Sequence, residues 1–264
     1  MLARIRSGSP ARIGEQPAEA TGVPDQPHSL DHPIFTESLR RIRLLLAEQA
    51  RFDPVLAAAL AGLTPLEREL LERCIHSSGD AAIAAELRFS PAGGACAAGA
   101  AALAAGAPIL TDTAMAAAAV APMARRTFGN RVVCLLDWAP AQAPAGSTRA
   151  AAGMGAAWRE LGRGAAGAAA PVVLIGSAPT ALERLLGLLA AEDPGGGAGL
   201  PSLVIGMPVG FVGVAESKRR LAQSGLSHIR LEGPRGGAGL VAAACNALLR
   251  SAWLAAANAP SPAR

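Results

Sequence analysis

The sequence predicts an α/β fold in which a mostly parallel sheet of about five strands carries helices on both faces, preceded by N-terminal helices. Three observations predict this fold. From about residue 108 onward, short apolar runs alternate with stretches of helical periodicity. The runs are apolar at nearly every position, as in strands that are buried on both faces. The 264 residues, of which 51% are hydrophobic, also suffice to bury a sizeable core.

The ends of the chain differ from its middle. Residues 1–30 contain Gly, Pro and Ser without periodicity, which predicts a flexible leader. Apolar side chains at helical spacing then predict an amphipathic helix from Pro33 to about Ala50. The Pro-rich residues 259–264 predict a disordered tail, so that one domain is expected over residues 31–258.

The next predicted helix has clear start and stop signals. Thr64 and Glu67 fit a T-x-x-E capping box, and Pro65 stands at the first helical position. The helix is expected to run to about His76, where Gly79 follows as a stop.

The remaining predicted elements alternate along the chain. The predicted helices are Asp80–Leu87, Pro91–Ala105, Thr113–Val120, Arg149–Leu161, Pro179–Ala190, Ala215–Ser224 and Gly239–Ala256. The predicted strands are Pro108–Leu110, Val132–Leu136, Val172–Ile175, Leu203–Ile205 and His228–Leu231.

The composition argues against several classes of protein. A net charge of only +4, with no basic run and no Tyr, is not typical of a nucleic-acid-binding protein. No segment offers about 20 strongly apolar residues without charge, so no membrane span is expected. The N-terminus lacks a secretory apolar region. The four cysteines are scattered without a CxxC motif, which predicts buried, reduced thiols in a cytoplasmic protein.

Ligand-binding loops are expected just after the strands, because open parallel sheets bind ligands at the carboxyl ends of their strands. One turn, Gly237–Ala242, fits the dinucleotide pattern G-x-G-x-x-A. The chain ends before a further strand could carry the acidic ribose-binding residue, so NAD or FAD is not expected. No cluster of His, Cys, Asp or Glu has metal-ligand spacing, and no metal is expected either.

His76 is the histidine with the most promising surroundings. It is expected to end a well-capped helix, and Arg73 lies three residues earlier on the same face. A group that titrates near neutral pH, next to an anion-binding arginine, suits acid–base chemistry. The alternative is a histidine that only interacts favourably with the helix dipole.

Several segments together resemble one family. They are His32–Ser38, Arg73–Asp80, Leu87–Pro91, Gly106–Asp112, Ser147–Ala151, Ile175–Leu182, Arg235–Gly237, Asn246–Leu248 and, as the strongest run, Val204–Lys218. This order of motifs resembles precorrin-8X methylmutase, or precorrin isomerase, of cobalamin biosynthesis, over about residues 32–250.

The resemblance implies a flavodoxin-like three-layer α/β/α fold and a homodimer. It implies an isomerase that moves a methyl group from C11 to C12 of precorrin-8X, gives hydrogenobyrinic acid and uses no cofactor. His76 stands at the position of the family's catalytic proton donor or acceptor. Ser38 and Arg73 stand at substrate-contacting positions, and Arg149 in the S-T-R motif is expected as a further contact. Arginine suits the carboxylates of such a substrate, because its guanidinium binds them in a bidentate manner.

The sequence departs from the family pattern in two of its motifs, and also in the extra leader and the atypical loop Leu136–Gly146. Thr111 stands where the family commonly has a cysteine, and the family's R-G-R-x-G-G-S loop is here Glu232–Ala238, with loss of an arginine and a serine. The second change puts substrate contacts at that loop in doubt. Neither change involves His76 or Arg73.

Three alternatives remain beside a metal-free isomerase. The substrate could be the cobalt-precorrin-8 of the anaerobic route. The protein could be a carrier that hands hydrogenobyrinic acid to the next enzyme without catalysis. It could also be a doubly wound enzyme for another small molecule or nucleotide. The sequence favours the precorrin-8X isomerase.

Overall fold

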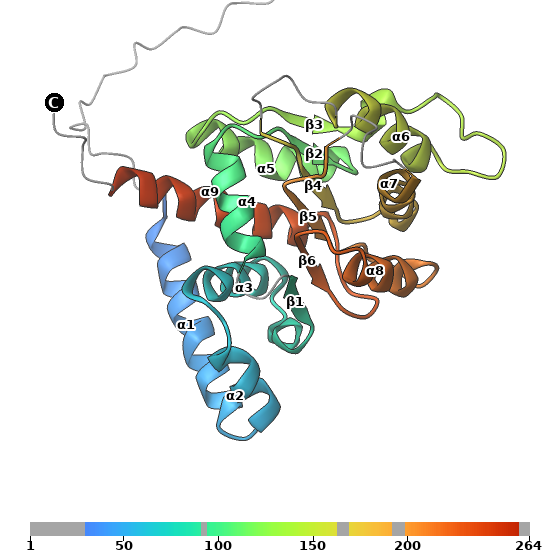
Figure 1. Ribbon diagram of the computed structural model, residues 1–264. Coiled ribbons are helices and arrows are strands. Elements are labelled where there is room, and N and C mark those ends of the chain that lie inside the picture. The colour runs from blue at the N-terminus through green and yellow to red at the C-terminus, as the bar shows by residue number, and fades with distance from the viewer. Residues whose placement is uncertain (1–29, 91–93, 163–168, 192–198, 259–264) are drawn as a thin grey trace, which may run out of the picture.

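The computed structural model describes residues 30–90, 94–162, 169–191 and 199–258 of the chain, and Figure 1 shows the arrangement of its elements. The strands are β1 (Leu87–Ser90), β2 (Ile109–Thr111), β3 (Val132–Cys134), β4 (Val172–Ile175), β5 (Leu203–Gly206) and β6 (His228–Leu231). The helices are α1 (Pro33–Ala50), α2 (Pro54–Ala61), α3 (Pro65–Ser78), α4 (Ala95–Ala104), α5 (Ala114–Arg126), α6 (Arg149–Leu161), α7 (Pro179–Ala191), α8 (Val214–Gln223) and α9 (Ala238–Ala257), with short 3-10 helices η1 (Ala81–Ala85) and η2 (Leu135–Trp138). The predicted leader, except for Leu30, and the predicted tail lie outside the described residues.

The strand order confirms the predicted fold class. The six strands form one sheet in the order β1-β6-β5-β4-β2-β3, and all neighbours from β6 to β3 are parallel. Numbered along the chain, the five parallel strands have the order 2-1-3-4-5, which is that of flavodoxin-like folds. The order reverses between β2 and β4. The carboxyl ends of these two strands are therefore where this fold class forms a crevice.

The sheet has one strand more than predicted. The segment Asp80–Leu87 was expected to be helical, but only the short η1 forms, and β1 follows it. β1 pairs antiparallel with β6, with Leu87 opposite Leu231 and Phe89 opposite Ile229. Without β1, the backbone N–H and C=O groups along one edge of β6 would have no partner in the sheet. Pairing with β1 satisfies them, and this tertiary pairing outweighs the local helix propensity of the segment.

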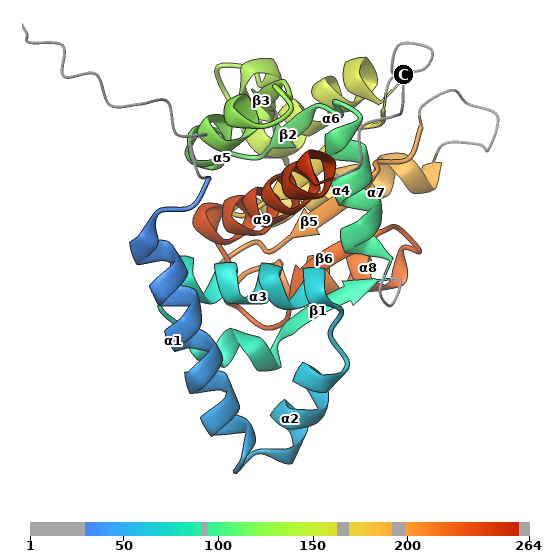
Figure 2. The same ribbon diagram turned by 90° about the vertical axis from the view of Figure 1, so that its left-hand side faces the viewer.

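Helices cover both faces of the sheet. α3, α4, α5 and α9 lie on one face, with α1 and α2 outside α3, while α6, α7 and α8 lie on the other (Figure 2). Alternate side chains of β4 enter the two cores. Val172 and Leu174 pack in the first core. Val173 and Ile175 pack in the second. Burial on both faces explains why β4 is apolar at every position.

Helix α9 is long and apolar because it lies at the centre of one layer. It packs against α3, α4 and α5, and half of its most apolar window is buried inside the protein. By length and composition alone, α9 meets the criterion for a membrane-spanning helix, contrary to the expectation that no such segment exists. Its apolar side chains are those that a buried helix needs, so packing in the core accounts for its composition.

Other elements also differ from the predictions. Helix α4 begins at Ala95, and residues 91–93 of its predicted range lie outside the described residues. Helix α2 was not predicted; it begins at Pro54 and is capped by Asp53, whose side chain accepts hydrogen bonds from two backbone N–H groups. Strand β3 ends at Cys134, two residues early, because the chain turns into η2. Helix α5 continues beyond Val120 to Arg126 in spite of Pro122. The four cysteines are buried and free, as expected.

Candidate active site

His76 lies in the last turn of α3, on the exposed side of that helix. The capping box predicted from the sequence is present: the Thr64 hydroxyl accepts from the Glu67 N–H, and the Glu67 carboxylate accepts from the Thr64 N–H at 2.8 Å. Gly79 ends the helix with φ of 70°, a left-handed conformation that favours glycine. The neighbouring side chains Cys74 and Ile75 enter the core. The helix therefore presents the imidazole to solvent.

Helix α1 holds the His76 ring from two directions. The Ser38 hydroxyl lies 2.7 Å from His76 Nδ1, at hydrogen-bond distance. The Phe35 ring packs edge-to-face on the imidazole, with 5.0 Å between the ring centres. Within the described part of the chain, no group bonds the other nitrogen, Nε2. The ring is thus fixed in orientation while Nε2 remains available to a substrate.

Arg73 lies one turn before His76 and shares its contact with Phe35. The guanidinium carbon lies 4.4 Å from the centre of the Phe35 ring, a cation–π contact. Its Nη1 is buried and has no hydrogen-bond partner, and Arg73 makes no salt bridge with another described residue. Burial is the main cause that lowers the pKa of this group. An unpaired buried N–H is costly, so a carboxylate that bonded to it would remove that cost.

Arg149 does not join this group. It is the first residue of α6, and its Nε donates to the Pro140 carbonyl at 2.9 Å. Next to it, the Thr148 and Thr180 hydroxyls are 2.8 Å apart, which places the start of α6 beside the start of α7. Of the four predicted site residues, the structure therefore brings together Ser38, Arg73 and His76, and leaves Arg149 near the carboxyl ends of the central strands.

Asp112 occupies the crevice between β2 and β4, a role that was not predicted. One oxygen of its carboxylate, Oδ2, accepts the N–H groups of Gly176, Ser177 and Ala178 at 3.0, 2.6 and 2.8 Å. Folds of this class use such a turn to bind anionic ligands. In this protein the Asp112 carboxylate takes the position that an anionic ligand would have at this turn. The only sequence signal was an acidic residue directly after a buried strand.

The loops at this edge of the sheet meet through glycines. A Cβ on Gly176 would lie 2.7 Å from the backbone of Gly237, and one on Gly236 would lie 2.0 Å from the Met207 carbonyl oxygen. The loop after β4, the loop after β5 and the loop before α9 are therefore in backbone contact. Ser77 Oγ lies 3.4 Å from the Gly239 carbonyl oxygen, which brings the end of α3 to the same place.

The turn that fits the dinucleotide pattern and the possible metal ligands can both be located in the structure. The G-x-G-x-x-A segment forms the start of α9, where Gly237 caps the helix without a side chain. No group of three His, Cys, Asp or Glu side chains among the described residues could hold a metal ion.

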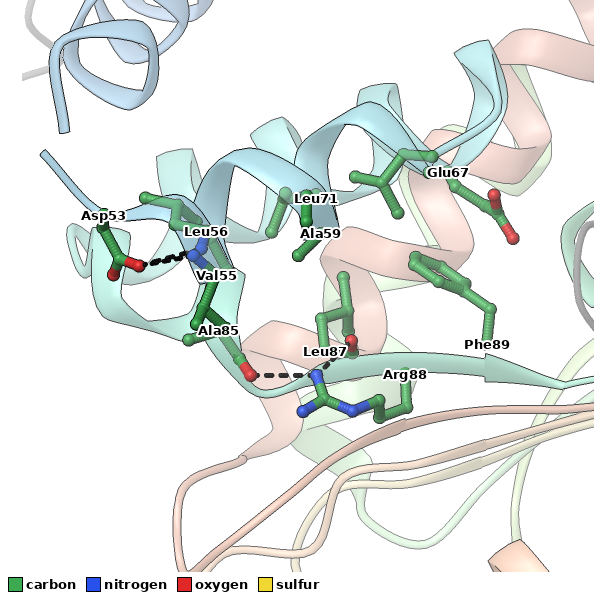
Figure 3. A pocket seen from close by; sticks show the side chains of 14 residues that line it. Asp53, Val55, Leu56, Ala59, Glu67, Leu71, Ala85, Leu87, Arg88 and Phe89 are labelled. Carbon is green, nitrogen blue, oxygen red and sulfur yellow. Dashed lines mark hydrogen bonds between the residues drawn. The ribbon is translucent and has the colours of Figure 1, made fainter. Parts of the chain in front are cut away.

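A separate cavity of about 390 Å³ lies between α2, α3, η1 and β1 (Figure 3). None of the four predicted site residues lines it. Its polar groups are bonded to the chain itself: Asp53 accepts from the backbone at the start of α2, and Arg88 donates to the Ala85 and Leu87 carbonyls. A ligand site normally needs polar groups that converge on its interior. We therefore place the candidate active site at His76.

Comparison with known proteins identifies the family. The sequence model of the precorrin-8X methylmutase family matches residues 33–251. The chain belongs to this family. A precorrin-8X methylmutase of Pseudomonas aeruginosa is 46% identical over 196 residues, which are 72% of this chain and 87% of that protein. A cobalt-precorrin-8 methylmutase of Synechocystis is 33% identical over 236 residues, 85% of this chain and 97% of that protein.

A solved structure agrees with the family assignment. The precorrin-8X methylmutase of Thermus thermophilus is 38% identical with a TM-score of 0.66, and the match covers 84% of this chain and 98% of that one. Members of the family are isomerases of cobalamin biosynthesis, and the chain is an enzyme of this kind. The four predicted site residues all lie inside the segment that matches the precorrin-8X methylmutase family.

The methylmutase chain contains a single lysine, and that lysine is buried. Lys218 is only 2% exposed, and its ammonium donates to the Gly233 and Arg235 carbonyls at 2.8 and 2.6 Å. It thereby ties α8 to the loop that departs from the family pattern. Burial lowers the pKa of Lys218 to about 8.

We expect the Lys218 amine to titrate about two pH units below an ordinary lysine, whose pKa is about 10.4. Between these two values the unfolded chain binds more protons than the folded one, so this group makes the free energy of unfolding rise with pH. With nitrogen-15 lysine, the protein gives one Nζ signal whose midpoint measures the pKa. A midpoint near 10 would contradict the predicted desolvation.

Proposed function

We propose that this protein moves a methyl group from C11 to C12 of precorrin-8X and gives hydrogenobyrinic acid, with His76 as the proton donor or acceptor. The observation that carries the proposal is the pairing of Ser38 with His76 beside Arg73. The family membership supports the reaction class. The residues supply the two things this reaction needs, which are a proton-transfer group and a cation for the carboxylates of the substrate.

Ser38 determines what His76 can do. When the serine hydroxyl donates to Nδ1, the ring carries its proton on Nε2 and can protonate or hydrogen-bond the macrocycle. The proton leaves Nε2 as the methyl group migrates and returns to Nε2 afterwards, so the protein is unchanged at the end of the reaction. General acid catalysis of this kind contributes about 10²–10⁴-fold.

Arg73 is proposed to bind a carboxylate of the macrocycle. Its unpaired Nη1 and its place one turn from His76 support this role. An open hollow lined by Pro33, Ile34, Glu37, Ser38 and Arg41 adjoins the same end of α1. Arg149 is proposed as a more distant contact at the carboxyl ends of the strands, suited to a substrate as wide as a macrocycle.

We further propose a homodimer in the cytoplasm, in which residues 31–258 act as one domain and no cofactor takes part. Phe211 and Val212, in the loop after β5, are 95% and 87% exposed. Adjacent exposed apolar side chains of this size are typical of a surface that another molecule covers. The resemblance to the family favours a second copy of the chain, and the product is proposed to pass to the next enzyme of the route.

A visible absorption time course with purified protein and metal-free precorrin-8X tests the reaction. Migration of the methyl group to C12 returns C11 to the conjugated path, so we expect a shift to longer wavelength at enzyme concentrations far below that of substrate. Cobalt-precorrin-8 serves as the second substrate, and conversion of that compound alone would reassign the protein to the cobalt route.

The alternative of a non-catalytic carrier predicts a different result. Neither substrate would then be converted, and hydrogenobyrinic acid would bind stoichiometrically and raise the melting temperature. Thermal shifts with NAD, FMN and ATP test the remaining alternative, a nucleotide-dependent enzyme.

A further inference from the structure

We propose that Arg235 is a positioning residue, which fixes the turn after His76 to the loops at the carboxyl edge of the sheet. The inference rests on the proposed function, because it assigns Arg235 a role in placing the proposed proton-transfer group. It also gives a structural role to the loop at which the departures from the family pattern put substrate contacts in doubt.

The Arg235 guanidinium is already occupied by carboxylates of the chain itself. It donates to Asp80 Oδ2 at 2.5 Å and to Glu86 Oε2 at 3.0 Å, and it also pairs with Glu86 Oε1. Two carboxylates thus share one guanidinium, in the fork geometry that makes such pairs strong and directional. A substrate carboxylate would have to displace one of them.

Asp80 lies in the turn that ends the helix of His76. It follows Gly79 directly and lies four residues after His76. Its other oxygen accepts the Ala82 N–H at 2.9 Å, so the side chain is held from both sides. The Ala82 N–H and then Arg235 lower the pKa of Asp80, which therefore stays ionised at neutral pH. The turn that ends the His76 helix is anchored here.

The backbone on both sides of Arg235 is held in place by hydrogen bonds. Lys218 bonds the Gly233 and Arg235 carbonyls, the Gly210 N–H donates to the Pro234 carbonyl at 3.0 Å, and the Gly237 N–H donates to the Met207 carbonyl at 2.9 Å. Gly236 has no room for a side chain. The loop is therefore fixed relative to β5, and the ion pair between Arg235 and Asp80 fixes Asp80 relative to the loop.

The hydrogen bond between the end of α3 and the start of α9 is weaker than these contacts. Ser77 Oγ approaches the Gly239 carbonyl oxygen only to 3.4 Å, which is long for a hydroxyl donor. Without Arg235, the last turn of α3 would keep its packing on α9 but lose its charged anchor. Because a displacement of about 1 Å at a catalytic group can cost about 10²-fold in rate, a modest loosening would be visible in turnover.

The test compares Arg235→Gln, Arg235→Lys and Asp80→Asn with Arg220→Gln. Arg220 pairs with Glu183 between α8 and α7, away from His76, and is the matched control. We expect Arg235→Gln and Asp80→Asn each to lower kcat about 10- to 100-fold with KM changed less than about twofold. We expect the Gln/Asn double variant to be no worse than either single one, and Arg235→Lys to recover part of kcat.

Other results would overturn the proposal. A raised KM at unchanged kcat would assign Arg235 to substrate binding, and an equal loss in Arg220→Gln would indicate general destabilisation. If the wild-type protein converts no substrate, the proposed function fails, but the nitrogen-15 histidine spectrum still tests the positioning role. The His76 signals should then move in Arg235→Gln and stay unchanged in Arg220→Gln; unchanged signals in both variants would refute it.

Discussion

Replacement of His76 by alanine is expected to lower kcat by about 10²–10⁴-fold while the protein stays folded. The side chain lies on the exposed side of α3, so its removal opens no cavity in the core. It removes the proposed proton donor and acceptor and leaves Arg73 in place. The spectral assay with precorrin-8X gives kcat and KM, and circular dichroism gives the melting temperature.

Ser38→Ala is the companion variant. It keeps the imidazole but removes the hydroxyl that bonds Nδ1. We expect a smaller loss in kcat than in His76→Ala, because the imidazole is still present but its orientation is no longer fixed. Turnover at the wild-type rate in His76→Ala would show that another group transfers the proton, or that the macrocycle needs no such transfer.

Replacement of Asp112 by alanine is expected to lower the free energy of unfolding by about 2–4 kcal/mol. The buried N–H of Gly176 loses its acceptor, at a cost of about 1–3 kcal/mol, and the half-buried N–H groups of Ser177 and Ala178 lose theirs at a smaller cost. Asp112 is only 1% exposed, so water does not readily replace the carboxylate. Urea denaturation measures the change.

Two further variants define the origin of that loss. Asp112→Asn keeps an acceptor oxygen and should lose less. Asp53→Ala removes an exposed carboxylate that caps α2 through two N–H groups, and should cost about 1 kcal/mol. If Asp112→Ala proved no more destabilising than Asp53→Ala, the carboxylate would not hold the β2 and β4 loops together.

The helix that carries His76 could be predicted because its signals are local. Thr64 and Glu67 are three residues apart, and Gly79 directly follows the last helical residue. The alternation of apolar runs and helices likewise predicted the five parallel strands. The strand β1 could not be predicted in this way, because its partner β6 lies more than a hundred residues later in the sequence.

The candidate site, too, could be predicted only where its contacts are local in the sequence. His76 and Arg73 share a helix face, so their proximity followed from helical spacing. Ser38 was expected at the site only from the resemblance to the family, because its contact with His76 depends on how α1 packs against α3. Arg149 was expected with the others, and the structure places it apart from them, at the start of α6.

The sequence by itself determined the fold class, the helix that presents His76 and the family to which the chain belongs, because periodicity, capping and the order of motifs are properties of neighbouring residues. Only the tertiary structure decided that Ser38 bonds His76, that Asp112 fills the crevice between β2 and β4, and that Arg235 binds Asp80. These contacts join residues that are 38 to 155 positions apart. They form when packing of the two cores brings distant loops to one edge of the sheet, which no local pattern in the sequence records.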